Sequence, residues 1–211
     1  MFDYSFIDLD NTLYDTVELE GDMVAIFKKY GVRRRDYDST FYRSLCTVSP
    51  DQYDYSFKEQ VQFLRELDYD LPDAIINELD ALLIPGYLFT DAYDFVNFIK
   101  TISKKTILLT AGDKEFQEQK ISGCGAGDWF DEVVIIPGGK EKYLQEHCNN
   151  NKILFINDNL RENISVSKNV SCAQVVIKFS AKHYHEEEVK KTNLPYFKNL
   201  LEIKNYVSEF I

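Results

Sequence analysis

Short apolar runs recur along the chain, and each of them ends in polar or turn-forming residues. Their brevity and β-branched content predict strands that are buried on both faces, as in a parallel sheet. These runs are Tyr4–Leu9, Thr106–Leu109, Val133–Ile136, Ile153–Ile156 and Val175–Phe179. Amphipathic helical patterns lie between or after them, at residues 95–102, 116–122, 142–148, 160–168 and 203–210. Strands that alternate with helices predict an α/β fold with a three-layer, Rossmann-like parallel sheet.

One long interval contains no convincing strand. Its apolar residues follow only helical spacing, as in the stripe that starts at Met23, and Pro72 precedes another such stripe at a position that suits the first helical turn. We therefore expect an α/β core formed by residues 1–15 and 89–211. An all-helical cap domain of residues 16–88 is expected to interrupt this core after its first strand.

Charge narrows the classes of partner. The 211 residues include 24 Lys or Arg and 35 Asp or Glu, which gives a formal net charge of −11 at pH 7. Such a chain repels nucleic-acid backbones and anionic membrane surfaces, so we expect neither as a partner. A small anionic substrate is still compatible, because a local cluster of donors can override the net charge.

The sequence also favours a cytoplasmic location. No apolar run approaches the ~20 residues that a membrane span needs, and the first residues lack the basic and apolar segments of a signal peptide. The cysteines are widely spaced and form no CxxC pair, which favours reduced, mostly buried thiols. They are Cys46, Cys124, Cys148 and Cys172.

Two carboxylates follow the first predicted strand. Asp8 and Asp10 are two residues apart, so both side chains can face one site at the carboxyl edge of the sheet, where open α/β sheets bind ligands. Two close carboxylates resist simultaneous ionisation, which suits two unlike catalytic roles. A turn in which these side chains bond the local backbone is the simpler alternative, and the pair alone does not exclude it.

Polar groups also follow the next three predicted strands. Thr110 and Ala111 supply a hydroxyl and an amide at a strand-to-helix turn, a place that can bind an anion. Lys140 stands where a helix is expected to begin, which is unfavourable for a cation unless it faces an anion. Asp158 follows the fourth strand. The coincidence of these groups with successive strand ends predicts a single site.

These motifs carry a resemblance to a known family. The sequence resembles the haloacid dehalogenase superfamily, in the phosphatase branch with a helical cap between the first and second motifs. The first motif matches at FIDLDNTLYD, the second at LLTAGD and the fourth at FINDN, with Lys140 as the third. The resemblance covers essentially the whole chain.

The resemblance implies a Mg²⁺-dependent phosphatase that hydrolyses a small phosphomonoester, such as a nucleotide or a sugar phosphate, through an aspartyl-phosphate. Asp8 would be the nucleophile, and Asp10 would be the general acid and then the base. Mg²⁺ would be bound by Asp8, by the backbone carbonyl of Asp10 and by Asp158.

The resemblance also implies how the phosphate is held. The Thr110 hydroxyl and the Ala111 amide would keep it in line, and Lys140 would stabilise its oxygens through the transition state. Dehalogenases of the superfamily lack an acid at the position of Asp10. Phosphoryl chemistry is therefore favoured over carbon–halogen chemistry.

Several positions leave alternatives open. Lys142 is close enough to Lys140 to rival it as the lysine of the third motif. Glu162 stands four residues after Asp158, where the family commonly has Asp, and could be an outer or second acidic group. The basic run Arg33–Arg35 could meet a second anionic group of the substrate, but a solvated turn is the simpler interpretation.

Two other functions fit the same motifs. A phosphomutase of this fold would return the phosphoryl group to another hydroxyl. A non-catalytic binding or regulatory protein could retain the fold, but the intact motifs argue against it, because binding alone needs no nucleophile.

Overall fold

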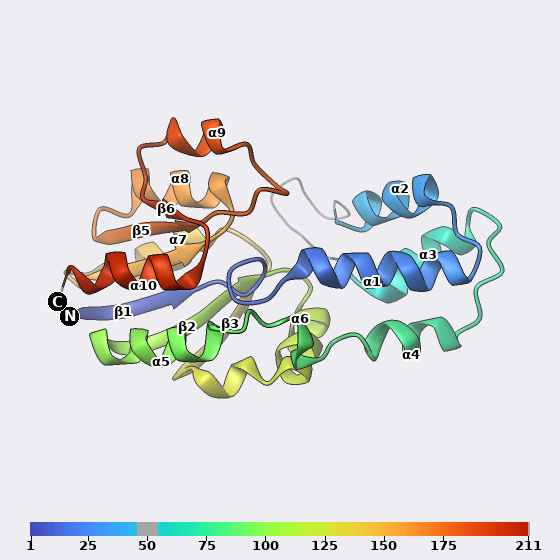
Figure 1. Ribbon diagram of the computed structural model, residues 1–211, viewed down its shortest axis with the longest axis horizontal. Coiled ribbons are helices and arrows are strands. Elements are labelled where there is room, and N and C mark those ends of the chain that lie inside the picture. Colours follow the sequence, from blue (N-terminus) through green and yellow to red (C-terminus); the bar gives the residue numbers. More distant parts are fainter. Residues whose placement is uncertain (46–54, 211) are drawn as a thin grey trace.

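The computed structural model describes residues 1–45 and 55–210. Within these residues the core is a six-stranded sheet, in the order β3-β2-β1-β4-β5-β6, and every neighbouring pair is parallel (Figure 1). The strands are β1 (Phe2–Ile7), β2 (Ser103–Ala111), β3 (Glu132–Ile136), β4 (Ile153–Asn157), β5 (Ala173–Lys178) and β6 (Tyr196–Phe197). This is the α/β architecture that the apolar runs predict.

Successive residues of the central strands point to opposite faces of the sheet. On β1, Phe6 and Ile7 are fully buried in two different hydrophobic clusters. Because helices cover both faces, the strands are apolar throughout instead of alternating. The covering helices are α5 (Ala92–Ile102) and α10 (Leu200–Ser208) on the Ile7 face, and α7 (Lys140–Glu146) and α8 (Leu160–Asn169) on the Phe6 face.

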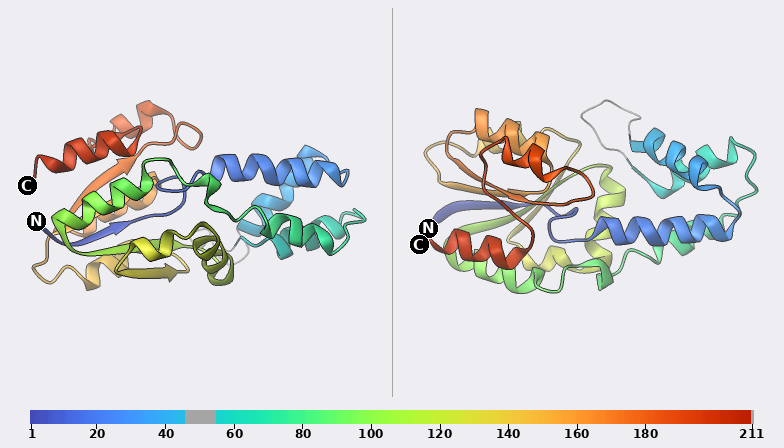
Figure 2. Two further views of the ribbon diagram at one scale, coloured as in Figure 1. Left: turned by 60° about the horizontal axis from the view of Figure 1, so that its bottom comes forward. Right: turned by 45° about the horizontal axis from the view of Figure 1, so that its top comes forward.

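The strand-free interval forms helices in the part of the chain that is described. They are α1 (Thr16–Lys29), α2 (Arg34–Leu45), α3 (Phe57–Arg65), α4 (Ala74–Asp80) and the short 3-10 helix η1 (Pro85–Tyr87). Figures 1 and 2 show these inserted helices beyond the carboxyl ends of the strands. No helix in residues 1–45 or 55–210 is long and apolar enough to cross a membrane. That residues 16–88 form a separate cap domain remains a prediction.

The chain enters and leaves the inserted helices at adjacent points. The amide of Asp15 donates to the carbonyl of Tyr87 at 2.7 Å, and the amide of Phe89 donates to the carbonyl of Leu13 at 2.9 Å. The hydrophobic cluster of the Ile7 face also continues from the sheet into these helices. The two crossings and the shared cluster therefore tie the insertion to the sheet.

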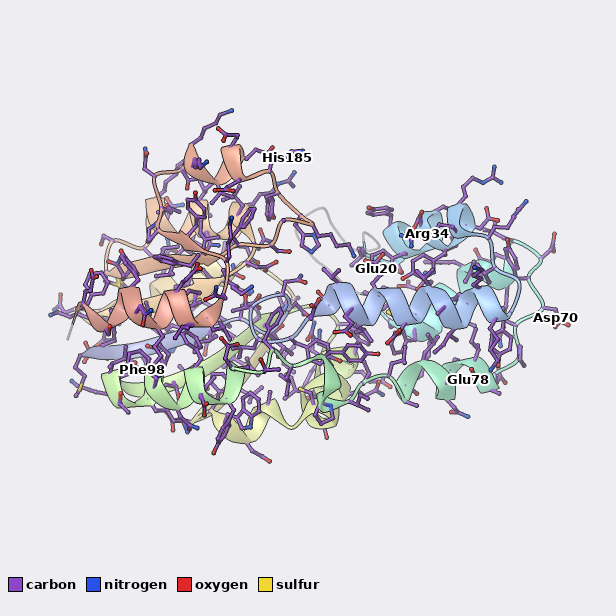
Figure 3. All side chains as sticks on the ribbon, viewed as in Figure 1. Glu20, Arg34, Asp70, Glu78, Phe98 and His185 are labelled. Carbon is purple, nitrogen blue, oxygen red and sulfur yellow. A yellow bond between two sulfur atoms is a disulfide. The ribbon has the colours of Figure 1, made fainter. Side chains whose placement is uncertain are left out.

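Side chains join the inserted helices to the core at two further places. On one side, the ring of Phe116 on α6 (Lys114–Cys124) packs edge-on against the ring of Phe57 at 5.0 Å. On the other side, the Lys182 ammonium pairs with Glu20 of α1 at 2.5 Å, and Figure 3 shows Glu20 on the flank of that helix. The insertion is thus held over the carboxyl edge of the sheet from both sides.

Gly123 of α6 lies against the end of the inserted segment. A Cβ at this position would come 1.9 Å from the backbone oxygen of Leu83. We expect Gly123→Ala to lower the free energy of unfolding by about 2 kcal/mol or more, because the backbone must shift to admit the methyl group. Thermal melting of the variant measures this loss.

Gly21 of α1 supplies the matched control. A Cβ there would meet nothing within 4 Å, so Gly21→Ala is expected to raise the free energy of unfolding by about 0.5–1 kcal/mol through helix propensity. Equal melting temperatures for the two alanine variants would contradict the close approach of α6 to Leu83.

Two elements differ from the sequence-based expectation: the strand β6 and the short helix α9 (Glu186–Lys190) were not expected. Helix α2 lies in the segment that was expected to be all-helical, but no apolar stripe marked it. The basic run Arg33–Arg35 is solvated, as expected, but Arg34 and Arg35 form the first turn of α2 instead of a free turn. Its charges are paired within the chain: Arg34 contacts Asp38 at 2.7 Å and Glu20 at 3.5 Å, and Arg34 and Glu20 lie side by side in Figure 3.

The cysteines are also partly corrected. Cys148, after α7, and Cys172, before β5, form a disulfide in the structure, so the expectation of reduced thiols is wrong for these two. The fold brings together two turns that are 24 residues apart in sequence, with a Cα–Cα distance of 6.0 Å. Cys124 is a free, buried thiol, as expected. Cys46 lies outside the described residues.

Candidate active site

The two carboxylates of the first motif lie at the carboxyl end of β1. The amide of Asp8 donates to the carbonyl of Ile156 at 3.0 Å, so Asp8 extends the pairing of β1 with β4 by one residue. The Asp8 residue is 3% exposed. Asp10 lies in the tight turn that follows, and its side chain is 27% exposed. The two carboxyl groups thus occupy different environments at one edge of the sheet.

Lys140 is the first residue of α7 and points its ammonium group at carboxylates. Gly139 precedes it with φ of 74°, a left-handed conformation that favours glycine, and this turn directs the lysine into the site. Its Nζ donates to Oδ1 of Asp8 at 2.7 Å and lies 3.1 Å from Oε2 of Glu162. Lys140 is 3% exposed, whereas Lys142 is exposed. The structure therefore favours Lys140 over Lys142.

Burial and charge shift the pKa values of the Asp8–Lys140 pair. Burial raises the pKa of Asp8 to about 6; the charge of Lys140 opposes this shift, and the charges of Asp10 and Glu162 add to it. Burial alone would lower the pKa of Lys140, but the charges of Asp8 and Glu162 outweigh burial and raise it above its usual value. At neutral pH the proton therefore stays on the lysine and leaves Asp8 available as a carboxylate.

Asp158 and Glu162 have different surroundings after β4. Asp158 is 8% exposed, and burial raises the pKa of its carboxyl group well above the usual value, with the charge of Asp8 adding to the shift. Among the described residues, none forms a hydrogen bond with its carboxylate. Glu162 by contrast accepts a hydrogen bond from Nδ2 of Asn157 at 2.8 Å and contacts Lys140. Glu162 thus contacts Lys140, while the buried carboxyl group of Asp158 has no hydrogen-bond donor of its own among the described residues.

The chemistry of these donors fits a divalent cation. Asp8 and Asp158 are buried carboxylates whose ionised forms are disfavoured, and a nearby cation would stabilise both. Oxygen donors of this kind suit Mg²⁺. The described ranges contain no group of three or more His, Cys, Asp or Glu side chains arranged for a metal. The magnesium ligands that the resemblance implies include only two such side chains, Asp8 and Asp158, together with the backbone carbonyl of Asp10.

Asp158→Asn is expected to stabilise the metal-free protein near neutral pH. The folded chain holds the proton of Asp158 more tightly than the unfolded chain, so the free energy of unfolding falls as pH rises from about 4 through the raised pKa. Because Asn does not ionise, the variant does not lose this stability. We expect its free energy of unfolding near pH 7 to be higher by about 2 kcal/mol, or its melting temperature by about 4–8 °C.

Melting curves in EDTA and in Mg²⁺ test this expectation. Near pH 3 the wild-type protein and the variant should melt at about the same temperature, because Asp158 is then mostly protonated in both the folded and the unfolded chain. Mg²⁺ should raise the melting temperature of the wild-type protein and not that of the variant. A variant that is less stable than the wild-type protein in EDTA near pH 7 would contradict the assignment.

Thr110 and Ala111 end β2 beside the carboxylates. Thr110 is 1% exposed, and its buried Oγ1 has no hydrogen-bond partner among the described residues. A buried hydroxyl without a partner fits a bound anion. At the start of α6, the side chain of Asp113 accepts from the amide of Phe116 at 2.7 Å. The anion contacts expected from Thr110 and Ala111 both lie at the end of β2 and stay a prediction.

Two further residues at the site come from α6 and escaped the sequence analysis. Nζ of Lys120 lies 2.5 Å and 2.7 Å from the two carboxylate oxygens of Asp10. Nε2 of Gln117 donates to Oδ2 of Asp10 at 3.1 Å. The available signal was weak: both residues fall on the face of α6 that also carries Phe116 and Ile121.

Comparisons with known proteins give the fold. The chain is similar over 99% of its length to 98% of a haloacid dehalogenase-like hydrolase from Burkholderia xenovorans, with 19% identity and a TM-score of 0.74. It is similar over 99% to 99% of L-2-haloacid dehalogenase from Xanthobacter autotrophicus (14% identity, TM-score 0.62). It is also similar over 97% to 98% of the HAD-hydrolase YfnB from Bacillus subtilis bound to magnesium (14% identity, TM-score 0.62). No protein-family model and no curated protein matches the sequence.

Proposed function

The chain has the haloacid dehalogenase-like fold, and on this premise we propose that it is a Mg²⁺-dependent phosphatase of small phosphomonoesters. One observation carries the proposal: a buried carboxylate, Asp8, is held by Lys140 at the carboxyl edge of the sheet, and a second carboxylate, Asp10, follows two residues later with partners of its own. This arrangement suits a nucleophile and a separate acid–base group.

In the first half of the proposed reaction, a carboxylate oxygen of Asp8 attacks phosphorus. Lys140 holds Oδ1, so Oδ2 is the oxygen that remains for the attack. The bond from phosphorus to the leaving oxygen breaks, and Asp10 gives its proton to that oxygen. The products are an alcohol and an aspartyl-phosphate.

In the second half, water attacks the phosphorus of the aspartyl-phosphate. Asp10 takes a proton from the water, and the Asp8 carboxylate leaves with its electron pair, so that inorganic phosphate and the original enzyme result. Lys140 and the Thr110 hydroxyl would stabilise the phosphoryl oxygens in both halves. Mg²⁺, held by Asp8, the Asp10 carbonyl and Asp158, would offset the repulsion between the carboxylate and the phosphate dianion.

Dehalogenase chemistry is disfavoured for this site. An ester formed on Asp8 from a carbon–halogen bond needs no acid to protonate a halide leaving group. In this chain the acidic residue Asp10 is instead held by a buried lysine and a glutamine.

The proposed partner is a small phosphorylated metabolite, such as a nucleotide or a sugar phosphate. Nucleic acid and membranes are not expected as partners, because the net charge of −11 repels both.

Phosphate release from a panel of phosphomonoesters, in Mg²⁺ and in EDTA, tests the proposal. We expect turnover of one class of compound in Mg²⁺ and its loss in EDTA. Product analysis separates hydrolysis from mutase chemistry, because a mutase returns an isomeric phosphate ester and releases little inorganic phosphate. A protein that binds phosphate esters in Mg²⁺ and transforms none of them would contradict the proposal and favour a binding role.

A further inference from the structure

We infer that Lys120 and Gln117 of α6 are positioning residues for Asp10, an inference that rests on the proposed role of Asp10 as the general acid and base. The Lys120 ammonium lies 2.5 Å from Oδ1 and 2.7 Å from Oδ2 of Asp10. Gln117 donates a third hydrogen bond, to Oδ2 at 3.1 Å. Three donor contacts from one helix thus fix the orientation of this carboxylate.

The burial of Lys120 distinguishes this contact from an ordinary surface ion pair. Lys120 is 1% exposed, and lysine is almost never so deeply buried unless it is paired. Aromatic rings surround its head: Nζ lies 5.3 Å from the ring centroid of Phe116 and 5.9 Å from that of Tyr14. The side chain therefore has one polar destination among the described residues, which is Asp10.

Gln117 links Asp10 to the turn that is proposed to bind phosphate. Besides Asp10, its Nε2 lies within hydrogen-bond distance of the carbonyl of Ala111, at 3.4 Å. Ala111 ends β2 directly after Thr110. The acid–base carboxylate and the phosphate-binding strand end are thereby held in one frame, and α6 supplies that frame.

This frame has a definite chemical consequence. A general acid must keep one carboxylate oxygen aligned with the leaving oxygen, and each carboxylate oxygen has two acceptor sites. Lys120 and Gln117 occupy both sites on Oδ2 and one site on Oδ1, which leaves one site, on Oδ1, for the transferred proton. Loss of these donors would let the carboxyl group rotate. The rate should then fall most for substrates whose alcohol is a poor leaving group, because these depend most on the transferred proton.

Lys120→Met tests the inference, with kcat/KM measured on substrate pairs that differ in the acidity of the leaving alcohol. This ratio reports the steps up to the release of the alcohol. We expect it to fall by about 30–100-fold for alkyl phosphates and by less than about 3-fold for aryl phosphates, whose leaving group needs little help from an acid. Lys120→Arg, which keeps the charge and the donors, is expected to recover part of the loss.

The Asp10→Asn variant and the double variant Asp10→Asn/Lys120→Met complete the test. If Lys120 acts through Asp10, the double variant is no slower on alkyl phosphates than Asp10→Asn alone. Lys114→Met, at the exposed start of the same helix, is the matched control and should keep wild-type kinetics. Melting temperatures of all variants separate loss of fold from loss of alignment.

Each other outcome has a distinct meaning. An equal loss on alkyl and aryl phosphates for Lys120→Met, in step with its melting temperature, overturns the inference and leaves a merely structural lysine. Selective loss for Asp10→Asn without selective loss for Lys120→Met also overturns it, while the proposed function stands. A wild-type protein that hydrolyses neither class overturns the proposed function and the role of Lys120 with it.

Discussion

Asp8→Asn is expected to reduce phosphate release by at least about 10⁴-fold, because an amide cannot serve as the nucleophile that forms the aspartyl-phosphate. The fold should persist. Asn has nearly the same shape as Asp, its side-chain oxygen can still accept from Lys140, and Lys140 keeps Glu162 at 3.1 Å. The variant also removes a buried carboxyl group whose pKa is raised by burial, which offsets part of the lost ion pair.

Acid-quenched incubation with a substrate labelled in its phosphoryl group makes the Asp8 experiment decisive. The wild-type protein should retain covalent label and the variant should not. Asp3→Asn is the matched control: it changes a carboxylate to an amide at the other end of the same strand, where Asp3 pairs with Lys104 at 2.7 Å, and it should keep activity. Phosphate release or covalent label at wild-type levels in Asp8→Asn would refute the nucleophile assignment.

The second large effect is expected for Lys140→Met, which should lower kcat/KM by about 10²–10³-fold through loss of charge stabilisation in the transition state. It should also destabilise the fold, because Asp8 and Glu162 lose their shared cation; breaking such a buried pair costs about 3–5 kcal/mol. The kinetic constants and the melting temperature must therefore both be measured in Mg²⁺, because a bound ligand stabilises the folded protein.

Lys142→Met is the matched control for Lys140→Met. It removes the same type of side chain two residues along the same helix, but Lys142 is exposed. We expect activity and melting temperature close to those of the wild-type protein. Activity loss confined to Lys142→Met would reverse the assignment of the two lysines. Lys140→Arg restores the charge. We expect its melting temperature to recover more fully than its kcat/KM, because a guanidinium places its donors differently.

The strands that frame the site could be predicted from sequence because their signal is local. A buried parallel strand must be apolar on both faces, so β1 to β5 stand out as short β-branched runs, and the polar residues after them mark the edge where ligands bind. The placement of Asp8, Lys140 and Asp158 follows from this rule together with the topology. Their roles in catalysis and metal binding remain proposals.

The features that were missed have no local signal. Helix α2 buries Asp36, Tyr37, Thr40 and Ser44, a face too polar for an apolar stripe to reveal. The strand β6 spans two residues. Lys120 lies two turns inside a helix, and only tertiary packing brings it to Asp10. The Cys148–Cys172 disulfide likewise depends on how two distant turns meet, which spacing does not disclose.

The chain enters and leaves the inserted helices at adjacent points, where Asp15 is hydrogen-bonded to Tyr87 and Phe89 to Leu13. The inserted helices could therefore be exchanged as one unit. Their two ends already meet at hydrogen-bond distance, so an insert of another length needs only to begin and end at this spacing. The entropy of closing a loop grows slowly with its length, by about 0.6 kcal/mol per doubling. Evolution or protein engineering could therefore replace the inserted helices above the carboxyl edge of the sheet, while the sheet keeps its strand order and the residues at its edge.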